Sequence, residues 1–273
     1  IILPVFLLFG LYGGLFFPDL PAASTAAGEA LFTVMTFNQW GGSRSAETAR
    51  VLLEGDAPDV VALQELTPQM TEIFLTEVGT IYPYHIFEPG EDYKGSGMLS
   101  RYPLTPLDSA HLDDPDWHVQ IVEVALEEEA ITFYNVHPYA TNPLYYFEEG
   151  MSVPDEVKAS FEHRMWLFER LLDDIARRSG PVIVAGDFNS TDQSDVYTLM
   201  RGRLHDAYRA VGWGFGHTFP AYAGRYHGIP IFPRQMRIDM IFYSDALVAL
   251  ESKVGRSCGE SDHLPLLARL GLR

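Results

Sequence analysis

The chain has 273 residues, of which 47% are hydrophobic and 21% are charged, so it can build a full apolar core. Its 19 basic and 37 acidic residues give a net charge of -18, which argues against a protein that coats DNA, because such binding depends on Lys and Arg. The same charge leaves a nuclease open, since a local basic groove and bound divalent ions can offset the overall field. The single cysteine, Cys258, excludes an internal disulfide.

The first 18 residues carry no charge and are rich in Leu, Phe and Ile; the first charged residue is Asp19. A helix of about 18 residues just crosses the apolar part of a bilayer, which is about 30 Å thick. We therefore expect residues 1–18 to be the end of a truncated membrane-spanning or signal-like segment, followed by a linker over residues 19–30 and one folded domain over residues 31–273. A buried hydrophobic helix is the alternative. The first interpretation predicts a membrane-anchored or extracytoplasmic protein.

Strands and helices follow the linker in turn. The expected elements are a strand over residues 31–38, a helix over 45–54, a strand over 59–63, a helix over 67–78 and a short strand over 97–100. Strands are indicated by alternating or continuous apolar residues, and helices by apolar residues three or four positions apart. Ser45 and Thr67 are expected to cap the two helices.

The second half begins with strands over residues 119–126 and 131–136, which an acidic turn joins into an expected hairpin. A long amphipathic helix is expected over residues 154–178, ended by Gly180 and Pro181. Further strands are expected over residues 181–185, 237–243 and 264–270. Because strands and helices do not alternate strictly, the pattern favours a layered α/β sandwich over a doubly wound sheet.

Polar residues of the kinds that bind metals and phosphate stand at the ends of these strands. Strand ends joined by loops meet at one rim of a sheet, so we expect these residues to converge there. Carboxylates and carboxamides are suitable ligands for Mg²⁺, and histidines can donate hydrogen bonds to a phosphate. The residues in question are Asn38, Gln64, Glu65, His137, Asp187, Asn189, Asp239, Asp262 and His263.

Short segments around these residues resemble, in their order, the motifs of the endonuclease/exonuclease/phosphatase superfamily. That group includes DNase I-like nucleases, AP endonucleases, neutral sphingomyelinases and inositol polyphosphate phosphatases. Each segment alone is a weak signal, but together they span residues 31–270 in the family's order. The segments are Phe37-Asn38, Gln64-Glu65, Gly97–Pro103, Asn135–His137, Gly186–Ser190, Arg237–Asp239 and Ser261–His263.

The resemblance implies an α/β (α+β) fold of the DNase I-like kind, a four-layered α/β sandwich with two central mixed β-sheets. It also implies a hydrolase of phosphate esters that uses Mg²⁺, or Mn²⁺ in its place. Glu65 would be the principal metal ligand, with Asn38 and Asp262 nearby. Whether one or two metals are bound stays open.

The remaining roles are also implied by the resemblance. Asp187 would orient or deprotonate the attacking water, and Asn189 would hold the phosphate. His263, paired with Asp239, would stabilise the transition state or act as the base. His137 would contact the phosphate from the other side.

Histidine at position 137 is similar to the nuclease, sphingomyelinase and phosphatase branches, whereas AP endonucleases usually have tyrosine there. In DNase I-like enzymes this histidine has an acidic partner. Here the candidates for that partner are Glu91, Asp92 and Glu123. The other histidines are expected to be structural or on the surface, although His217–Pro220 resembles a family loop near the site.

Two stretches, residues 139–150 and 213–237, are rich in aromatic residues and could set specificity. Such residues can stack on bases, rest on a lipid interface or simply pack within a loop. We expect a membrane-tethered or exported phosphoesterase that acts on a phospholipid, a lipid-linked phosphate or a small phosphoester. A secreted DNase I-like endonuclease, with DNA or RNA as its substrate, is the alternative. The intact polar set argues against a catalytically silent binding module.

Overall fold

The computed structural model describes residues 31–273 except residues 56, 92, 113, 115–116, 127–128 and 227–228, and before residue 31 only residues 6, 10, 13–14 and 17–19. The expected membrane segment and linker therefore lie largely outside the described residues. In the part of the chain that is described, no helix is both long enough and apolar enough to cross a membrane.

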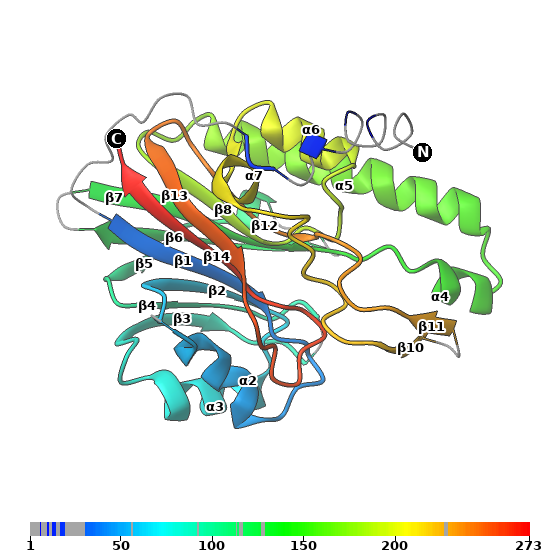
Figure 1. The fold of residues 1–273 in the computed structure, drawn as a ribbon, viewed down its shortest axis with the longest axis horizontal. Helices are drawn as coiled ribbons and strands as arrows, with labels where there is room; N and C mark the ends of the chain where they lie inside the picture. The colour runs from blue at the N-terminus through cyan, green and yellow to red at the C-terminus, as the bar shows by residue number, and fades with distance from the viewer. Residues whose placement is uncertain are drawn as a thin grey trace.

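Two six-stranded sheets form the centre of the molecule (Figure 1). The strands of the first sheet are, in spatial order, β13 (Leu247–Val254), β14 (Leu266–Leu272), β1 (Leu31–Asn38), β2 (Val60–Gln64), β4 (Ser96–Ser100) and β3 (Tyr84–Glu88). Those of the second are β5 (Leu104–Pro106), β6 (Trp117–Leu126), β7 (Glu129–Pro138), β8 (Val182–Asp187), β12 (Asp239–Tyr243) and β9 (His205–Asp206). A separate hairpin pairs β10 (Gly224–Tyr226) with β11 (Ile229–Ile231).

Both sheets are mixed. The pairs β1–β2 and β7–β8 are parallel, and the other strand pairs described within the two sheets are antiparallel. The helices are α2 (Ala46–Arg50), α3 (Pro68–Val78), α4 (Pro143–Glu148), α5 (Val153–Ile175), α6 (Asp195–Arg201) and α7 (Ala207–Val211), with 3₁₀ turns at Val51–Leu53 and Ala110–Leu112.

The molecule has four layers because the central strands of both sheets bury residues on both faces. In β1, Phe32 and Val34 point into the core between the two sheets, while Met35 and Phe37 pack against α2 and α3. The outer face of the second sheet packs against α5 and α6 through residues such as Phe168. Figure 1 shows these helices on opposite sides of the paired sheets. The expected fold class is thereby confirmed.

Every strand and helix expected from the sequence is present, with small shifts at the ends. Ser45 caps α2, its hydroxyl accepting from the Glu47 amide at 3.1 Å, and Thr67 caps α3 in the same way. The expected helix over residues 45–54 is shorter than predicted, because it tightens into a 3₁₀ turn after Arg50. The elements that the sequence analysis did not predict are β3, β5, β9, β10, β11, β13, α4, α6 and α7.

Strand register brings the expected site residues to one rim. Asn38 and Gln64, the last residues of the parallel strands β1 and β2, lie opposite each other. In the second sheet, Asp187 ends β8 and is paired with Asp239, which begins the antiparallel strand β12. Because β7 runs parallel to β8, His137 near its end reaches the same rim.

Candidate active site

The side chain of Asn38 links the two sheets at this rim. Its Nδ2 atom donates to Glu65 Oε1 at 3.0 Å and to Asp187 Oδ2 at 3.1 Å. Its Oδ1 atom accepts from the Trp40 amide at 3.0 Å. The side-chain nitrogen of Asn38 therefore bridges the carboxylates of Glu65 and Asp187. The expected role of Asn38 as an oxygen ligand of a metal stays a prediction.

Glu65 follows β2 with a φ of 55°, in the left-handed region that non-glycine residues adopt infrequently. Neighbouring groups hold it there. The Gly41 amide donates to Glu65 Oε2 at 2.8 Å, and the Gln39 side chain donates to the Glu65 main-chain carbonyl. In this conformation the carboxylate meets Asn38 and His137 at the rim.

Asp187 is the most contacted carboxylate of the site and is almost fully buried. Its Oδ1 atom accepts from the Asn189 amide at 2.8 Å. Burial raises the pKa of Asp187, an effect that the charge of His263 opposes and that of Asp239 reinforces. A carboxyl with a raised pKa is suited to exchanging a proton with a substrate or a water molecule.

His263 and Asp239 form a buried pair. The Nδ1 atom of His263 lies 2.9 Å from Asp239 Oδ2, and its Nε2 atom lies 3.7 Å from Asp187 Oδ2. Although burial lowers the pKa of His263, the charges of Asp239 and Asp187 raise it to about 10. The imidazole is therefore protonated at neutral pH, with Nε2–H directed toward Asp187.

His137 faces the same carboxylates from the other side. Its Nε2 atom lies 3.7 Å from Glu65 Oε1 and 3.6 Å from Asp187 Oδ2. Its Nδ1 atom lies 2.8 Å from the main-chain carbonyl of Tyr93, which can only accept, so Nδ1 carries the proton.

This carbonyl stands where an acidic partner of His137 was expected. Glu123 is paired with Thr132 toward the other end of β7, so it is not that partner. Glu91 is exposed, and Asp92 lies outside the described residues. A main-chain carbonyl can orient an imidazole as a carboxylate does, but it adds no negative charge.

Three further expected residues take different positions. Asp262 is partly buried, and burial raises the pKa of its carboxyl group. The charge of His263 lowers this pKa and the charge of Glu65 raises it further, so the Asp262 carboxylate lies beside the cluster. Asn189 has a φ of 45° and donates from Nδ2 to the Pro138 carbonyl at 2.9 Å. Gln64 lies behind the site, where its Nε2 donates to Asn135 Oδ1 at 2.7 Å, so it supports the strands.

Arg164 is a site residue that the sequence analysis missed. From the buried face of α5 it donates to the carbonyl oxygens of Asn189 at 2.7 Å and Tyr139 at 3.0 Å. It thereby ties together the loops that follow β7 and β8. The available signal was a single charged residue on the apolar face of the expected helix, between Phe161 and Phe168.

Arg237, at the end of the stretch over residues 213–237, packs inside the protein, which was one of the alternatives for this stretch. Its guanidinium is fully buried and forms ion pairs with Asp206 at 2.8 Å and Asp192 at 3.2 Å, so it supports the fold and does not reach a substrate. By contrast, the loop at His217–Pro220 does lie at the site, because the Phe219 ring is 4.7 Å from that of His263.

Three of the remaining histidines are structural or lie at the surface, as expected. Each pairs with an acidic residue away from the cluster: His111 with Asp174, His163 with Asp114 and His205 with Asp245.

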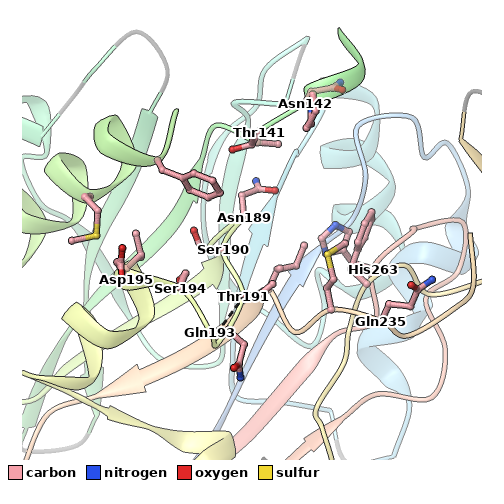
Figure 2. A pocket seen from close by; sticks show the side chains of 18 of the residues that line it. Thr141, Asn142, Asn189, Ser190, Thr191, Gln193, Ser194, Asp195, Gln235 and His263 are labelled. Carbon is pink, nitrogen blue, oxygen red and sulfur yellow. Dashed lines mark hydrogen bonds between the residues drawn. The ribbon is translucent and has the colours of Figure 1, made fainter. Parts of the chain in front are cut away.

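A cavity of about 1010 Å³ opens beside the cluster. Both Asn189 and His263 contribute to its wall (Figure 2). The rest of the wall comes from α5, from the start of α6, from the loops after β7 and β8, and from residues 219–238.

The cluster has the composition of a metal site. Among the described residues, Asp187, Asp239 and His263 bring oxygen and nitrogen atoms within 4.8 Å of one another, and since protonated His263 has no free lone pair, the carboxylates are the ligands that this group offers. Asp239 Oδ1 is buried without a hydrogen-bond partner, and Glu65 and Asp262 add carboxylates nearby. Hard divalent cations prefer such oxygen ligands, so the residues fit Mg²⁺ or a similar ion. This closest group of ligand atoms is not the expected set of Asn38, Glu65 and Asp262, although both belong to one site.

Comparison with known proteins gives two kinds of similarity and one negative result. The sequence matches the endonuclease/exonuclease/phosphatase family over residues 35–263. No curated protein sequence was found to match the chain. The structure is similar to D. rerio TDP2 complexed with single strand DNA product, with a TM-score of 0.64 and 18% identity, over 89% of this chain and 100% of that one.

Two bacterial proteins of the same family description are also similar in structure. The one from Bacteroides vulgatus has a TM-score of 0.63 at 18% identity, over 90% of this chain and 100% of the other. The one from Beutenbergia cavernae DSM 12333 has a TM-score of 0.59 at 20% identity, over 89% of this chain and 72% of the other. These low identities show a shared fold alone, whereas the sequence match spans most of the chain. The chain therefore belongs to the endonuclease/exonuclease/phosphatase family.

Proposed function

We propose that this phosphoester hydrolase depends on Mg²⁺, or on Mn²⁺ in its place, and acts on a phospholipid, a lipid-linked phosphate or a small phosphoester. The observation that carries the proposal is the meeting of two carboxylates and two histidines around one point. Asp187 lies 3.6 Å from His137 and 3.7 Å from His263, and Asn38 joins it to Glu65. Phosphoryl transfer needs this combination of a proton acceptor and hydrogen-bond donors.

In the proposed mechanism, protonated His263 donates from Nε2 to a non-bridging oxygen of the phosphate. Asp239 keeps the imidazole in that orientation through Nδ1. Because His263 already carries its proton, Asp187 is assigned as the group that orients and deprotonates the attacking water. Asn189 presents its amide from the next turn, and His137 approaches the phosphate from the side of Tyr93.

Glu65 and Asp262, with Asn38 beside them, would hold a divalent cation, which would supply positive charge to stabilise the negative charge that develops on the phosphoryl oxygens. The proximity of the Asp262 and Glu65 carboxylates supports such an ion, because two like charges close together favour a cation between them.

Attachment to a membrane through residues 1–18 is also part of the proposal, supported by the uncharged run that precedes Asp19. Protein that leaves membranes with detergent, but not with alkaline carbonate, would support it. Release by carbonate alone would contradict it.

An endonuclease is the second candidate. Its support is the structural similarity to D. rerio TDP2, which was crystallised with a single strand DNA product. The net charge of -18 speaks against it, because an acidic protein repels a polyanion over long distances.

The deciding experiment assays the full chain, purified free of metal in a non-ionic detergent. Sphingomyelin, phosphoinositides, plasmid DNA and single-stranded DNA are offered with Mg²⁺ and with EDTA. We expect Mg²⁺-dependent release of product from a lipid. Glu65→Gln and His263→Gln should lower kcat by about 100-fold or more, the size of effect seen when a transition-state contact is removed. His205→Gln, far from the cluster, is the matched control.

Cleavage of DNA without turnover of lipid would establish the endonuclease instead. Turnover that persists in EDTA would contradict metal dependence. Full activity in His263→Gln would contradict the proposed mechanism.

A further inference from the structure

The cavity beside the active site is larger than a phosphate group requires. Its volume of about 1010 Å³ is at the upper end of cavities that enclose most of a small organic ligand. Because Asn189 and His263 form part of its wall, a substrate whose phosphate lies at the cluster would extend into this space (Figure 2).

The exposed surface of the cavity wall is mainly apolar. Among the described residues that line it there is no Lys or Arg, and the only carboxylate is that of Asp195. Apart from His263 at the cluster itself, the described lining residues offer no cation to a second phosphate of a polynucleotide. The apolar side chains of the wall are those of Ala140, Pro143, Phe161, Met165, Val196, Phe219, Phe232, Met236 and Ile238.

A polar group stands beside the catalytic residues. Ser190 follows Asn189 in the wall, and Figure 2 shows the two next to each other. The Ser190 hydroxyl is buried and has no hydrogen-bond partner in the described structure. It could bond to an oxygen close to the substrate phosphate, with the apolar wall lying beyond it.

We propose that the cavity holds an aliphatic chain joined through oxygen to the phosphate that the site hydrolyses, so that the substrate is an amphiphilic lipid phosphate ester. This rests on the proposed function and narrows it to one class of substrate. An apolar chain gains free energy by leaving water for such a wall, where the only charged side chain away from the catalytic residues is that of Asp195 among the described lining residues.

Soluble diesters of p-nitrophenyl phosphate test the proposal, because their turnover replaces p-nitrophenol with water at phosphorus and is read by absorbance. The second ester group is methyl, octyl or thymidine, each used with Mg²⁺ below the concentration at which micelles form. Each buried methylene favours binding by roughly a factor of four, so even partial burial of the octyl chain should raise kcat/KM over methyl by at least about tenfold.

Two exposed phenylalanines allow a matched comparison of variants that should both fold. Phe232 lines the cavity and is 70% exposed, while Phe147 on α4 is 73% exposed and does not line it. Phe232→Ser should lower the octyl-to-methyl ratio by at least about threefold, and Phe147→Ser should keep it. Phe161→Ser, where α5 lines the cavity, is a second variant with the same expected effect.

An octyl-to-methyl ratio near one in the wild-type enzyme would overturn the inference while leaving the phosphoesterase intact. Preference for the thymidine ester over the octyl ester would also overturn it and favour the nuclease. An equal fall of the ratio in Phe232→Ser and Phe147→Ser would show that the cavity is not where the chain binds. Absence of Mg²⁺-dependent turnover of all three esters would overturn the proposed function itself.

Discussion

The two carboxylate oxygens of Asp187 contact or lie close to several other residues of the site. Its Oδ2 atom accepts from Asn38 and lies within 4 Å of the Nε2 atoms of His137 and His263, while Oδ1 accepts from the amide of Asn189. Asn38 and Asp187 are 149 positions apart in the chain. A change of charge at this one residue would therefore alter the environment of every other catalytic candidate.

A second buried carboxylate, Asp206, should make stability depend on pH. Burial raises its pKa, but the charge of Arg237 and a hydrogen bond from Tyr197 bring it below the ordinary value of 3.8. The folded protein thus binds fewer protons near Asp206 than the unfolded chain. The stabilisation is complete above about pH 4 and is lost as the pH falls through the folded pKa.

We predict that Asp206→Asn lowers the free energy of unfolding at pH 7 by about 3 kcal/mol, because Arg237 is left buried with less opposite charge. The difference from wild type should narrow below about pH 4, where Asp206 takes up a proton in the unfolded wild-type chain before it does so in the folded protein. Urea unfolding at several pH values measures both effects. The control is Asp245→Asn, whose exposed carboxylate should matter by less than about 0.5 kcal/mol. A constant difference down to pH 3 would contradict this account.

At the scale of elements, the long helix α5 does more than cover a sheet. Through Arg164 it fixes the loops after β7 and β8, which carry His137 and Asn189 toward the phosphate. The guanidinium also donates to the Thr141 hydroxyl, and it lies over the Phe161 ring with its central carbon 5.3 Å from the ring centre. The helix and the two loops therefore form one unit.

We predict that Arg164→Met lowers kcat/KM by up to about 100-fold, because a displacement of about 1 Å in positioned groups has effects of that size. Arg164→Lys should restore part of the loss, since it keeps one donor. Steady-state kinetics with a lipid ester, together with circular dichroism to show folding, is the measurement. Arg170→Met, on the exposed side of α5, is the control. A folded Arg164→Met enzyme with wild-type kcat/KM would refute the positioning role.

The elements differ in how well their sequences predict them. Strands β2 and β8 are predicted by short apolar runs that are buried on both faces, and β1 is predicted by alternating apolar residues. Strands β3 and β13 lie at sheet edges and are half exposed, so their residues carry no clear period. Helix α6 is short, although Ser194 at its start, which accepts from the Tyr197 amide, was an available signal.

At the scale of the whole molecule, the site lies where the two sheets meet and is formed by residues from both. Glu65 follows a strand of the first sheet, and Asp187 and Asp239 belong to the second. Several carboxylates close together repel one another, so an ion that binds between them should stabilise the assembled sandwich relative to the unfolded chain.

We predict that Mg²⁺ raises the free energy of unfolding, by about 2.7 kcal/mol at a concentration 100 times its Kd. EDTA should reverse the increase, and Glu65→Gln should weaken it. Glu77→Gln, at a surface ion pair with Arg50, should leave it unchanged. Urea unfolding followed over a Mg²⁺ titration provides the values. Equal unfolding free energies with Mg²⁺ and with EDTA would count against a metal bound at this site.

The sequence by itself determined the layered α/β class, the main strands and the residues that gather at the rim, because burial and short motifs leave a local pattern along the chain. Only the tertiary structure decided that Tyr93 orients His137, that Arg164 ties two loops together, that Arg237 is buried in ion pairs and that an apolar cavity adjoins the site. Each of these depends on contacts between segments far apart in the chain. Local periodicity reports which side of an element is buried, but not which distant residue meets it there.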